Sequence, residues 1–263
     1  MIIDVVTIFP ELFTSFLSES LMAKALEKKI LEVRLTTPRD FTVDRHRTVD
    51  DRPYGGGPGM VLKPEPLVAA IEALAQKRPK PWRIYLSPSG TKLTQNKVME
   101  LSRERRLMLI CGRYEGLDQR VIDLAVDEEI SIGDYVVNGG EVPAMVLIEA
   151  VARLRPGFMG KQDSAEEESH QAGLLEYPHY TRPPEFRGLK VPDVLLSGHH
   201  LEVSHWRMKA ALAKTLEKRP ELLARAELNP EAIRALSGIN HFQPIVSGRA
   251  IKPPPPAPEE SDK

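Results

Sequence analysis

The sequence predicts an α/β domain built on a mostly parallel sheet, followed by a smaller helical domain. Two observations carry this prediction. Short segments rich in Val, Ile and Leu alternate with amphipathic segments over the first part of the chain, and the composition becomes polar and then Pro-rich after Pro156. Strand–helix alternation is typical of parallel α/β domains. A chain of 263 residues, 41% hydrophobic and 28% charged, is long and apolar enough to form such a core.

The predicted strands are short apolar runs of the kind that a sheet buries on both faces. They are Ile2–Phe9, Leu31–Thr36, Arg83–Ser87, Leu107–Cys111 and Glu129–Val137. A helix is predicted from Pro10, with an apolar stripe of Leu12, Phe13, Phe16 and Leu17. Further helices are predicted over Pro66–Gln76, Asn96–Arg105, Gly116–Ala125 and Val142–Leu154.

Domain boundaries follow from the change in composition. We expect the α/β domain over residues 1–160 and a flexible interdomain linker over residues 161–173, which is acidic and lacks an apolar period. Residues 174–246 are expected to form the helical domain, and residues 247–263 a disordered Pro-rich tail. Helices within the second domain are predicted over Leu201–Lys218, Glu221–Ala226 and Pro230–Leu236.

Composition excludes several classes of protein. The 36 Lys and Arg nearly cancel the 37 Asp and Glu, so a globally basic nucleic-acid binder is excluded, although a local basic face is not. The single cysteine, Cys111, excludes an internal disulfide framework and a multi-cysteine zinc site. No apolar run is long enough to span a bilayer, and the N-terminus lacks a basic leader. We therefore expect a soluble, cytoplasmic protein without membrane association.

Four glycine-rich loops are the candidate functional segments. Val49–Met60 (VDDRPYGGGPGM) matches neither a phosphate-binding P-loop nor a dinucleotide fingerprint, and a flexible turn cluster is an equally good interpretation. Three further loops accompany predicted strands: Tyr85–Gly90, Cys111–Gly116 and Ile130–Pro143. Such loops converge at the carboxyl ends of parallel strands, where their main-chain groups can hold a ligand. Ordinary turn chemistry is the alternative for each loop taken alone.

Other patterns are less specific. Among the seven histidines no helical pair stands beside an acid, and no G-x-S-x-G motif occurs, which disfavours a zinc site and the usual hydrolases. The helical segment Val203–Arg219 carries five basic residues against one acid. Its Arg207, Lys214 and Lys218 share one face, which indicates either a phosphate-contacting surface or a solvated helix.

In this order, the motifs DDRPYGGGPGM, YLSPSG, CGRYEG, ISIGDYVVNGGE, GLLEYPHYTRP and SGHH resemble the bacterial tRNA (guanine-N1)-methyltransferase family, TrmD, of the SPOUT class. The resemblance covers about Met1 to Ile245. It implies a methyltransferase domain with a trefoil knot, a linker and a helical tRNA-binding C-terminal domain. It also implies a homodimer with its active sites at the subunit interface. Periodicity alone would not predict the knot, because threaded chains are rare.

The resemblance implies that S-adenosylmethionine is bound in a bent pose by the three strand-associated loops. Matching positions are Tyr85, Leu86, Ser87, Pro88, Gly90, Gly112, Tyr114, Glu115, Ile132, Gly133, Asp134, Tyr135, Val136, Val137, Asn138, Gly139, Gly140 and Pro143. Either Glu115 or Asp134 is expected to face the positive charge of the cofactor.

The implied reaction is methyl transfer to N1 of the guanosine immediately 3′ of the anticodon. By the resemblance, Glu168 is the general base and Arg153 stabilises charge on O6. The family usually has aspartate where this chain has Glu168. Candidate tRNA contacts are Asp50, Arg52, Ser169, His179, Tyr180, Arg182, Arg207 and Lys209. The resemblance also implies an association with Mg²⁺, although the sequence contains no evident ligand set and we assign no metal-binding residue.

Two other functions fit parts of the pattern. One is a knotted ribose 2′-O-methyltransferase, which is disfavoured because the resemblance continues through the linker and the C-terminal domain. The other is a non-catalytic RNA-binding module in which the glycine turns are purely structural. Binding of S-adenosylmethionine separates the second alternative from an enzyme.

Overall fold

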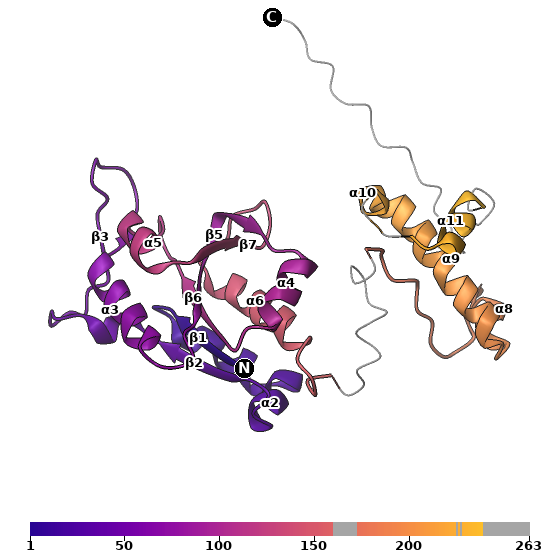
Figure 1. Ribbon diagram of the computed structural model, residues 1–263, viewed down its shortest axis with the longest axis horizontal. Coiled ribbons are helices and arrows are strands. Elements are labelled where there is room, and N and C mark those ends of the chain that lie inside the picture. The colour runs from indigo at the N-terminus through magenta and orange to yellow at the C-terminus, as the bar shows by residue number, and fades with distance from the viewer. Residues whose placement is uncertain (160–172, 225, 227, 239–263) are drawn as a thin grey trace, which may run out of the picture. The chain divides into compact units, whose positions relative to one another are not determined.

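A computed structural model describes residues 1–159, 173–224, 226 and 228–238. Its internal contacts divide the chain into two compact units, Met1–Glu166 and Glu167–Lys263 (Figure 1). The predicted linker lies outside the described residues except for Gly173, and the predicted tail lies wholly outside them.

The first unit contains a five-stranded, fully parallel sheet, which confirms the predicted α/β class. The strand order is β2-β1-β6-β5-β7. The strands are β1 (Ile2–Val6), β2 (Glu32–Thr36), β5 (Trp82–Lys92), β6 (Arg106–Cys111) and β7 (Glu128–Ser131). The predicted strand Glu129–Val137 was too long: β7 ends at Ser131 because the chain leaves the sheet there to form a loop.

Strand β5 contains an irregularity that builds a loop into the sheet. Both Leu86 and Thr91 are in register with Ile130 of β7, so the residues between them leave the regular ladder. The predicted strand Arg83–Ser87 was therefore too short, and the loop lies inside β5 rather than after it. Gly90 permits this path, because a Cβ there would lie 2.5 Å from the carbonyl carbon of Glu129.

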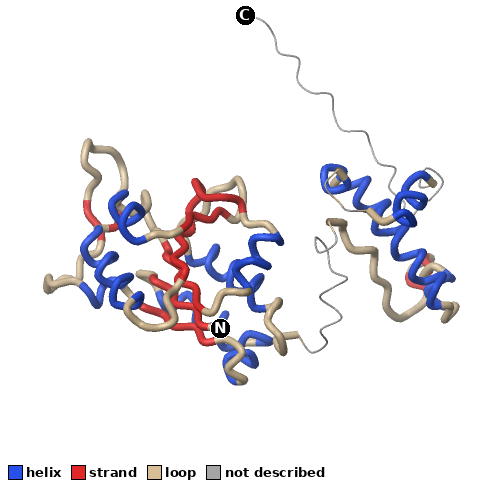
Figure 2. The backbone as a smooth tube through the Cα atoms, in the orientation of Figure 1, coloured by secondary structure: helices blue, strands red, loops and turns tan. Residues whose placement is uncertain are grey.

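Helices cover both faces of the sheet (Figure 2). One face carries η1 (Pro10–Phe13), α1 (Thr14–Ser18), α2 (Ser20–Glu27), α4 (Gln95–Ser102) and α6 (Glu141–Ala152). The other carries η2 (Pro38–Phe41), α3 (Pro64–Ala75) and α5 (Gln119–Ala125). Phe13 and Leu147 are fully buried in the first layer, and Ile71 and Val121 in the second. The central strands β1 and β6 lie between the two helical layers, which explains why their sequences, IIDVV and RLMLIC, are mostly hydrophobic.

Two predictions of where helices begin needed correction in the first unit. The segment from Pro10 is a 3-10 turn followed by two short helices, α1 and α2, and the second of these was not predicted. Helix α5 begins at Gln119 rather than Gly116. The main chain of residues 115–118 is already bonded to the segment around Met60 and Leu62, so it is unavailable for a helix.

That segment belongs to a small hairpin, which the sequence did not predict. Strand β3 (Asp50–Asp51) pairs in antiparallel fashion with β4 (Val61–Leu62), and the glycine-rich loop joins them. Leu62 N donates to Gly116 O (3.0 Å), and Asp118 N donates to Leu62 O (3.0 Å). The hairpin is therefore attached to the loop that follows β6.

Arg106 forms a buried ion pair within the sheet and also bonds the sheet to the end of α3. Arg106 Nε donates to Asp4 Oδ2 at 2.7 Å, and both side chains have no exposed surface. The rest of the guanidinium donates to main-chain oxygens of Lys77 (2.6 Å), Pro79 (3.1 Å) and Leu74 (3.0 Å). Arg106 thereby bonds the main chain at the end of α3 and just beyond it.

The described part of the second unit contains a short hairpin and helices. They are β8 (Glu185–Phe186), β9 (Leu189–Lys190), α8 (Asp193–Leu196), α9 (His200–Lys218), α10 (Pro220–Leu223) and α11 (Pro230–Ser237). Leu212 and Ala232 form a small core between α9 and α11. Helix α10 is shorter than the predicted Glu221–Ala226, and α8 was not predicted.

Candidate functional site

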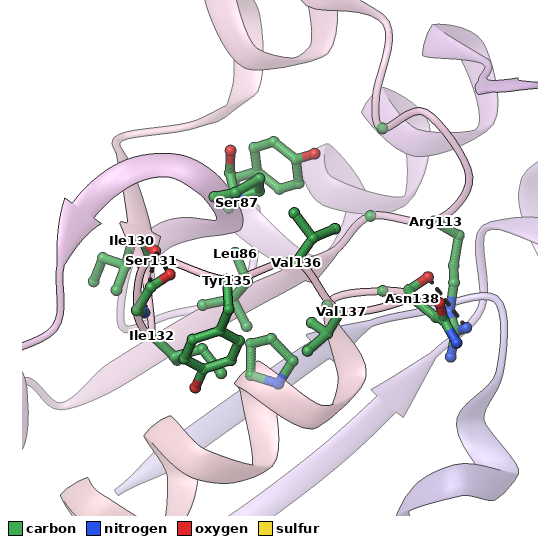
Figure 3. Close-up of a pocket in the computed structure, with 18 of the residues that line it drawn as sticks. Leu86, Ser87, Arg113, Ile130, Ser131, Ile132, Tyr135, Val136, Val137 and Asn138 are labelled. Atoms are coloured by element: carbon green, nitrogen blue, oxygen red, sulfur yellow. Dashed lines mark hydrogen bonds between the residues drawn. The ribbon is translucent and has the colours of Figure 1, made fainter. Parts of the chain in front are cut away.

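A cavity of about 280 Å³ lies at the carboxyl ends of β6 and β7, beside the irregular part of β5 (Figure 3). Three glycine-rich segments surround it: the irregular part of β5, the loop after β6 and the loop after β7. Its lining residues are Tyr85, Leu86, Ser87, Pro88, Gly112, Arg113, Tyr114, Glu115, Gly116, Ile130, Ser131, Ile132, Gly133, Tyr135, Val136, Val137, Asn138, Gly139, Gly140 and Pro143.

The loops after β6 and β7 are joined through their main chains. Gly140 N donates to Gly112 O at 2.9 Å, and Arg113 and Gly139 form an antiparallel bridge. A Cβ at position 140 would lie 2.7 Å from Cys111 Cα. Only glycine allows the two chain segments to approach so closely.

The cavity brings together every predicted cofactor residue except two. Gly90 packs against the backbone of β7 instead. Asp134 pairs with Lys92 Nζ at 2.5 Å, and its side chain is 83% exposed. Of the two acids considered for the cofactor's charge, Glu115 lines the cavity and Asp134 does not.

Four lining residues were missed by sequence reasoning: Arg113, Gly116, Ile130 and Ser131. Arg113 and Gly116 lie inside the CGRYEG motif, so their position in a candidate loop was the available signal. Ser131 ends β7, where its Oγ donates to Gly133 O (3.0 Å) and accepts from Gly133 N (3.2 Å). These bonds turn the chain sharply out of the sheet.

A buried carboxylate holds the wall of the cavity together. Glu141, at the start of α6, has no exposed surface; it accepts from Thr7 Oγ1 (2.7 Å) and from Arg113 Nε (2.8 Å). Arg113 also stacks on the Phe9 ring, 4.8 Å from its centroid, and donates to Asn138 O at 3.4 Å (Figure 3). The Glu141 carboxylate thus connects the end of β1, the loop after β6 and the start of α6.

Two titratable side chains near the cavity stay neutral at neutral pH. Burial, and then the charge of Glu129, raise the pKa of Tyr85 above its usual value. Burial, and then the charge of Glu141, raise the pKa of the Cys111 thiol well above its usual range. A thiol that resists ionisation is a poor nucleophile, which disfavours covalent catalysis through Cys111.

Of the two predicted catalytic residues, Arg153 does not line this cavity. Arg153 caps the C-terminal end of α6. It lies ten residues beyond Pro143, roughly 15 Å along the helix at about 1.5 Å per residue. Glu168 and Ser169 lie outside the described residues. The predicted contacts Asp50 and Arg52 lie at the base of the β3–β4 hairpin.

A second cavity, of about 500 Å³, lies within the second unit. His179, Tyr180, Arg182 and Arg207 line it, together with Trp206 and Tyr177. The Arg207 guanidinium lies 4.8 Å from the centroid of the Tyr177 ring, and the Tyr180 and Trp206 rings are 6.2 Å apart. The structure therefore brings four of the predicted RNA contacts together.

The basic face predicted on α9 needs correction. Lys214 Nζ donates to Glu176 O at 2.7 Å, so this ammonium group anchors the preceding segment rather than extending into solvent. Lys209 lies in a separate depression with His205, Glu231 and Arg234, and not beside Arg207. Positions 207 and 209 point to opposite sides of a helix, which accounts for the separation.

No group of three or more His, Cys, Asp or Glu side chains is placed to hold a metal ion within the described ranges. The described helices also include none long and apolar enough to cross a bilayer.

A parallel sheet that gathers glycine-rich loops around a cavity at its carboxyl edge defines the class of α/β proteins in which ligand sites are commonly found at that edge. The family model for tRNA (guanine-1)-methyltransferase TrmD matches residues 1–225. The chain belongs to this family, which confirms the resemblance predicted from the motifs.

Individual relatives agree with this assignment. The chain is 53% identical over 237 residues to a protein of Brevibacillus brevis, covering 90% of this chain and 97% of the relative. It is 51% identical over 240 residues to a protein of Actinobacillus succinogenes, covering 91% and 98%. A protein of Dictyoglomus turgidum is 53% identical over 237 residues, covering 90% and 96%. All three are named tRNA (guanine-N(1)-)-methyltransferase.

Proposed function

We propose that this protein transfers a methyl group from S-adenosylmethionine to N1 of the guanosine immediately 3′ of the anticodon in tRNA. One observation carries the proposal: in a chain of this family, the three glycine-rich motifs lie around a single cavity. A cytoplasmic location accompanies the proposal, because tRNA is modified there.

The cavity has the properties that an adenosine-containing cation requires. Its volume, about 280 Å³, is near the lower end of the range for small-molecule sites, roughly 300–1,000 Å³. Gly133 and Gly139 line the cavity without side chains, so a ligand such as an adenine edge or a ribose can approach the main chain there closely. Glu115 supplies a negative charge to the same space. S-adenosylmethionine, when bound, supplies an electrophilic methyl group on its sulfonium.

The two acids make a test of this assignment. Glu115→Gln is expected to weaken cofactor binding about 10- to 100-fold, because a hydrogen bond to a charged group is worth about 1.5–3 kcal/mol. Asp134→Asn is the control, since its carboxylate is exposed and already paired with Lys92; its effect should stay within a few-fold. Calorimetric titration with S-adenosylmethionine measures both, and a larger loss in Asp134→Asn would contradict the assignment.

The chemistry needs a base, because N1 of guanine carries a proton in the keto form and has no free lone pair. In this proposal Glu168 takes the N1 proton while the new N1–methyl bond forms. Arg153 stabilises the negative charge that develops on O6. A base in the linker fits an induced-fit site, in which bound tRNA completes the catalytic arrangement.

The proposal includes a homodimer with shared sites. Arg153 lies at the C-terminal end of α6, whereas the cavity of the same chain lies at the N-terminal end of this helix. A single chain therefore does not bring Arg153 and the cavity together. An exposed apolar surface beside the cavity, formed by Phe9, Leu12, Val142 and Val146, is suited to a second copy. These observations favour an active site that combines the cavity of one chain with the linker of its partner.

Mixing two inactive variants tests the shared site. Glu115→Ala damages the cavity and Glu168→Ala removes the base, so each homodimer should be inactive at limiting cofactor. A heterodimer with shared sites keeps one intact site, and activity is therefore expected to return. Purified heterodimers, isolated with two affinity tags, should be assayed directly. If they are as inactive as the homodimers, both residues act within one chain.

The trefoil knot is part of the proposal. Strand β6 lies between β1 and β5, and the segment around Gly140 passes within van der Waals distance of the backbone at Cys111. The loop after β7 therefore passes directly beside the end of β6, and this arrangement supports a threaded chain.

The aromatic and basic cavity of the second unit supports the proposed tRNA contacts of His179, Tyr180, Arg182 and Arg207. Its rings offer stacking surfaces and its guanidinium groups offer partners for phosphate. In the described part of the chain, Lys209 does not share this cavity, so its proposed contact with tRNA is independent of it.

Mass spectrometry of tRNA nucleosides after incubation with a labelled methyl donor tests the function itself. We expect label in 1-methylguanosine. Label in a 2′-O-methylated nucleoside would instead identify a ribose methyltransferase. An absence of both cofactor binding and label would identify an RNA-binding module.

A further inference from the structure

The glycine-rich loop between β3 and β4 is attached directly to the cavity wall. Glu115 N donates to Met60 O at 3.0 Å, and Leu62 N donates to Gly116 O at 3.0 Å. These two bonds lie on either side of the junction between Glu115 and Gly116. The backbone that carries the Glu115 side chain is therefore fixed by the end of the glycine-rich loop.

Gly59 is in direct contact with the Glu115 side chain. A Cβ at position 59 would lie 2.7 Å from Cγ and 2.8 Å from Cδ of Glu115, and closer still to Oε1. The conflict involves the stem of the side chain as well as its end, so a small rotation of the carboxylate would not remove it. Gly55, Gly56 and Gly57, in the same loop, have no atom within 4 Å of the corresponding position.

We propose that Gly59 is a positioning residue for Glu115: the space left by its missing side chain holds the Glu115 carboxylate at the cavity. The inference rests on the proposed function, since it takes Glu115 to bind the cofactor. It gives the glycine-rich loop a role in cofactor affinity, although Gly59 does not itself line the cavity.

The physical argument depends on two constraints. Because Met60 and Leu62 hold the backbone of Glu115 and Gly116 in place, Glu115 cannot retreat as a whole from a methyl group at position 59. Its side chain must then adopt another rotamer, which moves the carboxylate by several bond lengths. A displaced carboxylate loses its contribution to binding a cation in the cavity.

Gly56 provides a matched control. Gly59 has φ of +83° and Gly56 has φ of +79°, so alanine meets the same left-handed backbone strain at both positions. Only the alanine at position 59 meets Glu115. We expect similar melting temperatures for Gly59→Ala and Gly56→Ala, together with a cofactor Kd at least about tenfold weaker in Gly59→Ala alone. Calorimetry without tRNA measures this, so any role of the loop in RNA binding does not enter.

A double variant tests whether the effect passes through Glu115. In a Glu115→Ala background the extra methyl group has room, so Gly59→Ala should weaken cofactor binding little further. If Gly59→Ala alone fails to fold, Gly59→Ala with Glu115→Ala should fold as well as Gly56→Ala. Equal cofactor binding by Gly59→Ala and Gly56→Ala, full additivity in the double variant, or failure of the double variant to fold would each overturn the inference. Wild-type protein that binds no cofactor would instead overturn the proposed function.

Discussion

Replacing Glu168 with glutamine is expected to slow single-turnover methylation by about 10²–10⁴-fold, the usual effect of losing one positioned general base. The amide keeps the size of the side chain but cannot take the N1 proton. Cofactor binding should stay nearly unchanged, because the proposed role of Glu168 is to take the N1 proton of guanine and not to bind the cofactor. Comparing single-turnover rates with calorimetric Kd values separates these two effects.

Position 168 also departs from the usual aspartate of the family, which gives a second variant. Glutamate is one methylene longer, about 1.5 Å, a displacement that a small change in the path of the main chain can absorb. Glu168→Asp should therefore keep substantial activity. The neighbours Glu166 and Glu167 are matched controls, because a solvated acidic run would tolerate amide substitution equally at all three positions. If Glu168→Gln stays within a few-fold of wild type while Asp163→Asn or Glu167→Gln loses activity, the base is a different carboxylate.

Replacing Arg106 with methionine is expected to lower the free energy of unfolding of the first unit by about 3–5 kcal/mol. The change leaves the Asp4 carboxylate buried without its partner, and it leaves the main-chain oxygens of Leu74, Lys77 and Pro79 without this donor. Asp4 Oδ1 already lacks a hydrogen-bond partner among the described residues, so no second bond compensates for the loss.

Arg34 provides the control for Arg106, since its ion pair with Glu32 is exposed to solvent. Arg34→Met should cost no more than about 1 kcal/mol. Urea unfolding followed by Trp82 fluorescence in a Trp206→Phe background reports on the first unit alone. Equal midpoints for Arg106→Met and Arg34→Met would show that burial of the Arg106 pair adds nothing to stability.

Local sequence patterns predicted the sheet because its central strands, β1 and β6, are mostly apolar, and this pattern depends only on burial between two helical layers. They did not predict the interruption of β5, since the pairing of both Leu86 and Thr91 with Ile130 depends on a strand far along the chain. The late start of α5 has the same kind of cause, because the residues before it are bonded to Met60 and Leu62. Non-local pairing overrode local propensity in both places.

The candidate cavity was predicted well because glycine motifs mark the places where chain segments approach closely. The motifs did not show which of Glu115 and Asp134 lines the cavity, because this difference depends on the pairing of Asp134 with Lys92. Arg113 was overlooked because its importance comes from Glu141 and Thr7, which are distant in sequence. The roles of Arg153 and Glu168 rest on the resemblance, and the shared-site experiment and the Glu168 variants test them.

The order of strands in the sheet also has a consequence for synthesis on the ribosome. Strand β5 pairs only with β6 and β7, and both follow it in the chain. Its apolar residues Ile84 and Leu86 therefore leave the ribosome before either neighbouring strand exists. The second edge of β1 likewise stays unpaired until β6 (Arg106–Cys111) has been synthesised. During translation the nascent chain exposes unpaired hydrophobic strand edges, which makes this interval the period of greatest risk of aggregation and of greatest need for chaperones.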